Sequence, residues 1–257
     1  MMVKITEKCT MGCTHCMNAA TPDGKHMSLS TFEESLCFLA NNELCEQILL
    51  ITGGEPTEHP EFFKLLDIMF ETQKDFPFLI AVAVTTNGEA LQNDYEPYLK
   101  SIKVAKEAGI DLFYQVSADV RYYPRRIQTH KRIFREPNIV LCDDCIRWIY
   151  PQGRAKENNL DWKANSSKCF NVRAIAHQLP ENARLRDIEQ LLLQHEKSCT
   201  PHIGVNGEIK LGESDLCPAC ATIYDDMDTI MSKIRNFKCD ACNFINNRLP
   251  EQYRRLL

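Results

Sequence analysis

The chain has 257 residues, a formal net charge of −5, 44% hydrophobic residues and 25% charged residues. This length suits one full-sized core with a small second unit, and the composition is typical of a globular protein. The longest apolar stretch, residues 76–84, contains Pro77 and is too short to cross a bilayer, which excludes a membrane-spanning helix. The negative charge argues against a nucleic-acid partner, and we interpret the basic run at residues 121–135 as a solvated helix face.

The number of cysteines, 13, is the unusual feature of the composition. The N-terminal sequence MMVKITEKC has no secretory hydrophobic region, so we expect a cytoplasmic protein in a reducing compartment. An odd count makes complete disulfide pairing impossible. Clustered cysteines in such a protein favour metal ligands.

Five segments in the first two-thirds of the chain are predicted to be strands: residues 3–6, 47–51, 78–85, 111–117 and 138–142. Amphipathic helices are predicted between them. A capping-box pattern of Ser30 with Glu33 opens the first, Pro60 opens the second, and Gly109 ends the third. The expected buried faces are Phe32, Leu36 and Leu39; Phe63, Leu66, Met69 and Phe70; and Tyr98, Ile102 and Ala105.

Alternation of strands and helices predicts an α/β fold with a parallel sheet, as a barrel or a doubly wound sheet. In both, the active site lies at the carboxyl ends of the strands. Every unusual motif of this region follows a predicted strand: CTMGCTHC at 9–16, GGEP at 53–56, TTNG at 85–88 and SAD at 117–119. We therefore expect a site at that edge.

The pattern changes near residue 165. A helix is predicted at residues 187–196, with Ile188, Leu191 and Leu192 on one face, and the chain beyond it is cysteine-rich with short elements. We expect one domain at residues 1–165 and a second at residues 166–257.

Cys9, Cys13 and Cys16 place three thiols in one loop. Thiolates suit iron–sulfur clusters, zinc or copper(I), and three of them leave one iron of a [4Fe–4S] cluster without a protein ligand. Zinc with His15 or His26 as a fourth ligand, or unmetallated thiols, stay open on spacing alone.

The motifs together resemble the radical S-adenosylmethionine (SAM) superfamily. The Cys-x3-Cys-x2-Cys loop follows a first strand, and GGEP, the TNG turn, the VSAD segment at 116–119 and the PQGRA segment at 151–155 follow in the order of that family. The resemblance implies a partial (β/α)6 TIM-like barrel. It also implies that a [4Fe–4S] cluster cleaves SAM reductively to methionine and a 5′-deoxyadenosyl radical.

The resemblance assigns roles to individual residues. Cys9, Cys13 and Cys16 would bind three irons, and SAM would chelate the fourth. The implied SAM contacts are His15 beside the adenine, Gly53 and Gly54 beside the methionine part, Glu55 on the ammonium group, Asn87 and Ser117 on ribose or carboxylate, and Arg126 or Arg125 on the carboxylate. Each of these residues also has a purely structural interpretation when it is considered alone. Gly53-Gly54 would then form a turn, Glu55 would be a carboxylate at the start of a helix, and Ser117 would cap a strand end.

A second cysteine group comprises Cys199, Cys217, Cys220, Cys239 and Cys242. The two CxxC pairs have the spacing of a zinc ribbon. Residues 202–209 are predicted to form a β-hairpin with Asn206-Gly207 at its turn. This arrangement resembles the twitch or SPASM extension, a small cysteine-rich α+β domain with an auxiliary [4Fe–4S] cluster. The implied ligands are Cys199, Cys217, Cys239 and Cys242, with Cys220 spare or replacing one of them.

The resemblance implies an oxidative enzyme, either a dehydrogenase of a small molecule or a peptide maturase. The alternatives are a structural zinc in the second domain, or a zinc-binding interaction protein. The implied electron donor is a flavodoxin or ferredoxin. Cys9 follows so closely on the N-terminus that we expect no leader-binding domain before the barrel.

The remaining cysteines are expected to have structural roles. Cys37 and Cys45 are expected in the core, and Cys142 and Cys145 are expected to be buried structural thiols. Cys169 has no identifiable partner, and no catalytic base is identified.

Overall fold

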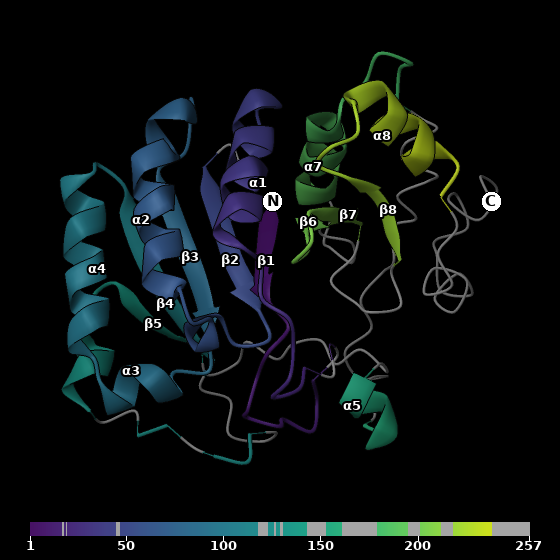
Figure 1. The fold of residues 1–257 in the computed structure, drawn as a ribbon. Coiled ribbons are helices and arrows are strands. Elements are labelled where there is room, and N and C mark those ends of the chain that lie inside the picture. The colour runs from purple at the N-terminus through teal and green to yellow at the C-terminus, as the bar shows by residue number, and fades with distance from the viewer. Residues whose placement is uncertain are drawn as a thin grey trace.

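The computed structural model describes residues 1–16, 18, 20–44, 47–117, 123–125, 127–128, 131–142, 153–160, 179–194, 201–211 and 218–237. Within them, one eight-stranded sheet has the order β5-β4-β3-β2-β1-β6-β7-β8 (Figure 1). The strands are β1 Met2–Thr6, β2 Ile48–Gly53, β3 Ala81–Thr86, β4 Asp111–Ser117, β5 Ile139–Cys142, β6 His202–Ile203, β7 Glu208–Lys210 and β8 Ala219–Thr222.

Helices α1, α2 and α4 stand side by side along the parallel strands (Figure 1). The α-helices are α1 Leu29–Asn41, α2 Phe62–Thr72, α3 Glu89–Asn93, α4 Glu96–Glu107, α5 Gly153–Glu157, α7 Leu185–Gln194 and α8 Met227–Arg235. Short 3-10 helices lie at η1 Pro56–Glu58, η2 Gln73–Asp75 and η3 Arg132–Arg135. The five strands predicted from the sequence are confirmed, although β3 begins at Ala81 rather than at residue 78.

Strands β1 to β5 pair in parallel. Alternate side chains along them, such as Val3 and Ile5 of β1 or Leu112 and Tyr114 of β4, enter one buried apolar cluster with the helices. This period of two buries one face of each strand against the helical layer. The α/β class is therefore confirmed, and the mostly parallel sheet fits a partial TIM-like barrel.

The C-terminal hairpin continues the same sheet. Strand β6 pairs in parallel with β1, and β7 and β8 follow in antiparallel pairing. Gly207 has a φ of +77° at the turn, and the Gly204 N–H donates to the Glu208 carbonyl across it. The predicted hairpin is confirmed, as is a helix near residues 187–196. The expected boundary between residues 165 and 166 lies outside the described residues and stays a prediction.

Three predictions about the helices were wrong. Helix α1 is capped by Ser28, whose Oγ accepts from the Thr31 N–H at 3.0 Å, and not by Ser30. Helix α2 begins at Phe62, so its buried stripe is Phe62, Leu65, Leu66, Met69 and Phe70, and Phe63 is 37% exposed. Cys37 is exposed, because it follows the buried Leu36 by one position and so points about 100° away from it.

The basic run at residues 121–135 was also interpreted as a helix face. Its described part contains the short helix η3 and lies otherwise outside regular structure. Among the described residues, no helix combines the length and the apolar character that crossing a membrane would need.

Candidate functional site

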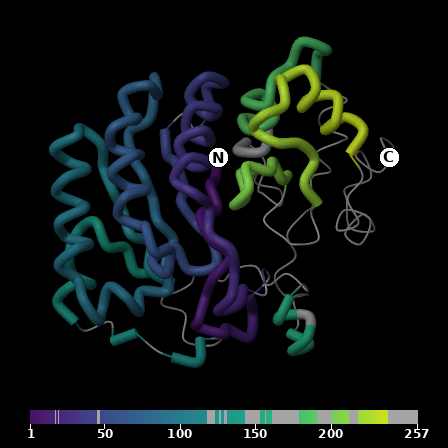
Figure 2. The backbone as a smooth tube through the Cα atoms, in the orientation of Figure 1, coloured from purple at the N-terminus to yellow at the C-terminus, as the bar shows by residue number. Residues whose placement is uncertain are grey.

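The carboxyl ends of the parallel strands meet at one edge of the sheet. The loops that follow β1 and β2 and the helix that follows β3 gather there, at the lower end of the view in Figure 2. Four of the motifs that the sequence singled out therefore begin at this edge, as predicted.

The three cysteines of the first loop lie close together. Cys9 and Cys13 are buried in a small apolar cluster with Met11 and Ala20, and the half-buried Cys16 packs against it. Burial, together with the smaller effect of the neighbouring thiols, raises the pKa of the Cys9 thiol to about 11 and that of Cys13 to about 12. A bound cation would oppose this effect and favour the thiolates.

Within the described parts of the chain, no group of three Cys, His, Asp or Glu side chains converges on a single-ion site. A [4Fe–4S] cluster does not need such convergence, because each cysteine binds a different iron. The closely placed thiols fit that donor set.

The glycine pair after β2 docks against the cysteine loop. The Gly54 N–H donates to the Thr6 carbonyl and the Glu55 N–H to the Lys8 carbonyl, both at 2.7 Å. A Cβ at Gly53 would lie 2.4 Å from the Thr6 carbonyl oxygen, and one at Gly54 would lie 2.2 Å from that of Lys8. Glycine is therefore required here by the approach of the protein's own backbone.

The Glu55 carboxylate connects β2 with β3. Its Oε1 accepts from the Thr57 hydroxyl and the Thr86 hydroxyl, each at 2.7 Å, and its Oε2 accepts from the Asn87 N–H at 2.7 Å. The side chain is 3% exposed. Burial raises the pKa of the Glu55 carboxyl, and these donors oppose part of the rise. The predicted contact with an ammonium group stays a prediction, and the carboxylate already has protein partners.

Asn87 presents its side-chain amide at this edge of the sheet. Its Oδ1 accepts from the Glu89 N–H at 2.9 Å, whereas its buried Nδ2 has no hydrogen-bond partner among the described residues. A buried amide left unpaired costs free energy, so this group is suited to donate to a bound ligand. Gly88 allows the turn, since its φ is +76° and a Cβ would lie 2.5 Å from Val116. Half-buried Ser117 ends the neighbouring strand β4.

His15 has an aromatic neighbour that sequence reasoning missed. Its ring lies 5.3 Å from the ring of Tyr123, centroid to centroid, and Tyr123 packs against the cysteine cluster. Tyr123 belongs to the basic run at residues 121–135, where an aromatic residue among arginines was the available signal.

Of the two arginine candidates, Arg125 lies within the described residues. Arg125 forms an ion pair with Glu89, with Nε 2.7 Å from Oε1 and Nη2 2.8 Å from Oε2. Its guanidinium is thus already held by a carboxylate. Arg126 lies outside the described residues.

A cavity of about 290 Å³ opens beside the cysteine loop. It is lined by Lys4, Glu7, Asn18, Ala20, Thr21, Gly24 and Gly54. The volume suits a small molecule or part of a larger one.

Buried His59 and half-buried His26 lie near the base of the cysteine loop. The His59 Nδ1 accepts from the Glu61 N–H at 3.0 Å, and its Nε2 lies 2.8 Å from the Met27 carbonyl oxygen. The ring is therefore neutral with the proton on Nε2, and burial lowers its pKa. The His26 ring packs edge-on against the His59 ring, with 4.9 Å between the ring centroids.

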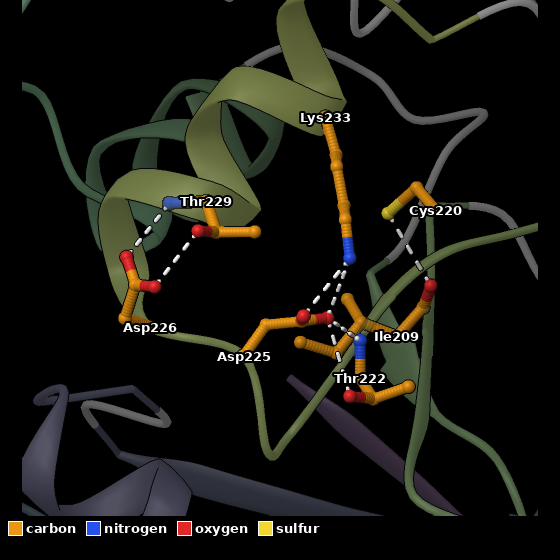
Figure 3. A network of polar contacts seen from close by, with 7 residues as sticks. All are labelled: Ile209, Cys220, Thr222, Asp225, Asp226, Thr229 and Lys233. Carbon is orange, nitrogen blue, oxygen red and sulfur yellow. Dashed lines mark hydrogen bonds and ion pairs between the residues drawn. The ribbon is translucent and has the colours of Figure 1, made fainter.

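Of the second cysteine group, only Cys220 is described. Its thiol in β8 donates to the Ile209 carbonyl oxygen in the neighbouring strand β7 (Figure 3), at an S···O distance of 3.3 Å. Burial raises the pKa of this thiol to about 12. Asp225 lies nearby, where it pairs with Lys233 and accepts from the Thr222 N–H. Cys199, Cys217, Cys239 and Cys242 lie outside the described residues, as do Cys45, Cys145 and Cys169. Cys142 is half-buried at the end of β5.

A family model described as the radical SAM superfamily matches residues 3–118. The chain is 30% identical over 128 residues to a GTP 3′,8-cyclase of Shewanella denitrificans, which covers 48% of this chain and 37% of that protein. It is 27% identical over 206 residues to a GTP 3′,8-cyclase of Paenarthrobacter nicotinovorans, covering 78% and 53%. The chain thus spans about a third to a half of the length of these relatives.

Two solved structures share the fold at 14% identity. One is BtrN in complex with AdoMet and 2-DOIA, with a TM-score of 0.51 over 95% of this chain and 84% of that chain. The other is Streptococcus suis SuiB bound to S-adenosylmethionine, with a TM-score of 0.51 over 92% and 67%.

Proposed function

We propose that this chain, whose residues 3–118 belong to the radical SAM superfamily, is an enzyme that cleaves SAM at a [4Fe–4S] cluster and oxidises a substrate. One observation carries the proposal. Three neighbouring thiols, the docked glycine turn and an unpaired amide donor lie at the same edge of the sheet. This combination suits an enzyme that binds a cluster and a polar cofactor side by side.

The protein's own residues have separate tasks in this proposal. Cys9, Cys13 and Cys16 hold the cluster. Asn87 donates its free amide hydrogen to the ribose or carboxylate of SAM, and Ser117 lies at the adjacent strand end. Glu55 fixes the turn that carries Asn87. When bound, the cluster and SAM supply a one-electron cleavage that generates a radical able to abstract hydrogen.

The test compares cysteine variants of the anaerobically reconstituted protein. Replacing Cys9, Cys13 or Cys16 with Ala is expected to abolish formation of 5′-deoxyadenosine, because each thiolate binds one iron of the SAM-accessible cluster. Cys37→Ala is the matched control, since this thiol is exposed on α1, and it should keep wild-type turnover. SAM cleavage that persists in any of the first three variants would overturn the proposal.

We extend the proposal to a second cluster bound by Cys199, Cys217, Cys239 and Cys242, which would accept the electron of the substrate radical. The contact between Cys220 and Ile209 supports leaving Cys220 out of this set. Cys220→Ser should therefore keep the wild-type iron content, whereas Cys217→Ala should lose iron. A structural zinc at these cysteines is the competing proposal, and metal analysis of the anaerobic wild type decides between them.

The substrate is a small molecule or a peptide in this proposal, and a flavodoxin or ferredoxin supplies the electron. A second candidate is cyclisation of a nucleotide, because the named relatives are GTP 3′,8-cyclases. Incubation with GTP, SAM and reductant separates the two. Conversion of GTP to a cyclised product would favour the second candidate, and SAM cleavage without GTP consumption would favour the first.

A further inference from the structure

We propose that Arg154 is a positioning residue for the first cluster, which clamps the cysteine loop and places a positive charge beside it. The inference rests on the proposed function, since it concerns the same loop. Arg154 belongs to the PQGRA segment, for which the proposed function gives no role.

The contacts of Arg154 span the loop. Its Nε donates to the Cys13 carbonyl at 2.9 Å, and its Nη1 donates to the Ala20 carbonyl at 2.7 Å. Its backbone N–H donates to the Cys16 carbonyl at 3.0 Å. One residue therefore holds the carbonyls of two cluster cysteines and the returning limb of the loop.

The neighbours of Arg154 fit this task. Gly153 has a φ of +49°, which directs the chain into α5, and Ala155 is fully buried. Asn158, one turn later, donates its Nδ2 to the Thr14 carbonyl at 3.2 Å. Helix α5 thus attaches to the loop through both side chains, about 140 residues after it in sequence.

The guanidinium of Arg154 also brings a positive charge to the cysteine loop. Its side chain donates to carbonyl oxygens, and among the described residues no carboxylate forms an ion pair with it. Three thiolates and a cluster that accepts an electron form a region of growing negative charge. A guanidinium beside them stabilises the reduced state and so raises the reduction potential.

The test uses the full-length protein with reconstituted clusters and four variants: Arg154→Gln, Arg154→Lys, Asn158→Ala and Arg135→Gln. Lys keeps the charge but loses the two-pronged geometry, and Gln loses the charge. Asn158→Ala removes a contact with the loop without changing charge. Arg135→Gln removes an exposed arginine of η3.

Three quantities are measured. The first is the midpoint potential of the paramagnetic signal that changes when SAM is added, which identifies the first cluster. The second is the rate at which a chelator extracts its iron. The third is hydrogen exchange of the loop amides at residues 9–20 in the apoprotein, which needs no cluster.

We expect Arg154→Gln to have a more negative potential and roughly 10- to 100-fold weaker cluster retention. Arg154→Lys should keep a midpoint potential near that of the wild type, but it should lose iron to the chelator faster and protect the loop amides less from hydrogen exchange. Asn158→Ala should lose protection with an unchanged potential, and Arg135→Gln should match the wild type throughout.

A wild-type potential in Arg154→Gln would overturn the role of the charge, and wild-type protection in Arg154→Lys would overturn the clamp. If Arg154→Gln does not fold, the potential of Arg154→Lys decides: a shift to more negative values contradicts the proposal. Failure of the proposed function looks different, because the wild type itself would then assemble no cluster that responds to SAM.

Discussion

At the scale of single residues, Glu55 is a motif residue whose carboxylate stabilises the fold through hydrogen bonds. Glu55→Ala should lower the free energy of unfolding of the apoprotein by about 3 kcal/mol or more, because it leaves the buried donors of Thr86 and Asn87 and the half-buried hydroxyl of Thr57 without this acceptor. Urea denaturation measures this. Glu71→Ala, an exposed position on α2, is the control and should change stability by about 0.5 kcal/mol or less.

The same variant separates two roles. If the carboxylate serves only to bind the SAM ammonium group, Glu55→Ala would weaken SAM binding and leave unfolding unchanged. Weaker binding together with lost stability would mean that Glu55 acts through the turn that carries Asn87.

His59 makes stability depend on pH. Its folded pKa is lowered by burial below the ordinary value of about 6.5, so the neutral ring is the form that folding favours. The stability it contributes is fully present above about pH 6.5 and is lost as the pH falls through the folded pKa. Protonation of Nδ1 would remove the acceptor of the Glu61 N–H.

We therefore expect the free energy of unfolding of the apoprotein to fall from pH 7.5 to pH 5.5, with a slope of up to about 1.4 kcal/mol per pH unit for each group that titrates. His59→Gln should be less stable at pH 7.5 but less sensitive to pH. His26, whose pKa burial also lowers, accounts for part of any remaining slope. Equal slopes in the wild type and His59→Gln would contradict this assignment.

At the scale of elements, the hairpin of β6 and β7 depends on Gly207. An alanine there would combine left-handed backbone strain with a Cβ 3.1 Å from Ile223, whereas Gly109, at φ +87°, has no atom within 4 Å of its hypothetical Cβ. Gly109→Ala should therefore cost about 1 kcal/mol from strain alone, and Gly207→Ala should cost more. Parallel denaturation of both variants checks this, and an equal loss would show that the contact with Ile223 relaxes freely.

At the scale of the whole molecule, the two cysteine groups should support separable steps. Replacing Cys239 and Cys242 together with Ala should leave SAM cleavage intact and abolish the oxidised product, with the iron content falling from about eight to about four per chain. Circular dichroism is the control for folding, because a metal site can supply much of a small domain's stability. Stoichiometric zinc and a single cluster in the wild type would contradict the second cluster and leave the first intact.

The sequence by itself determined the local elements and the edge at which the site lies. Hydrophobic periods of two and of 3.6 residues depend on neighbours along the chain, so the strands and helices could be predicted from them. Motifs directly after strands must meet at one edge of a parallel sheet, which placed Cys9, Glu55 and Asn87 together. Errors such as Ser30 for Ser28 arose because several polar residues near a helix start can serve as its cap.

Only the tertiary structure decided which groups pair across the fold. The C-terminal hairpin pairs with β1, and the Glu55 carboxylate accepts from donors of β3 and the turn after it. Arg125 forms an ion pair with Glu89. Arg154 donates to the carbonyls of Cys13 and Ala20. Hydrogen bonds and ion pairs depend on distance in space, and residues about 140 positions apart leave no periodic trace of their contact in the sequence. Among the described residues, the site atoms available to a ligand are those without a partner, such as the Asn87 Nδ2.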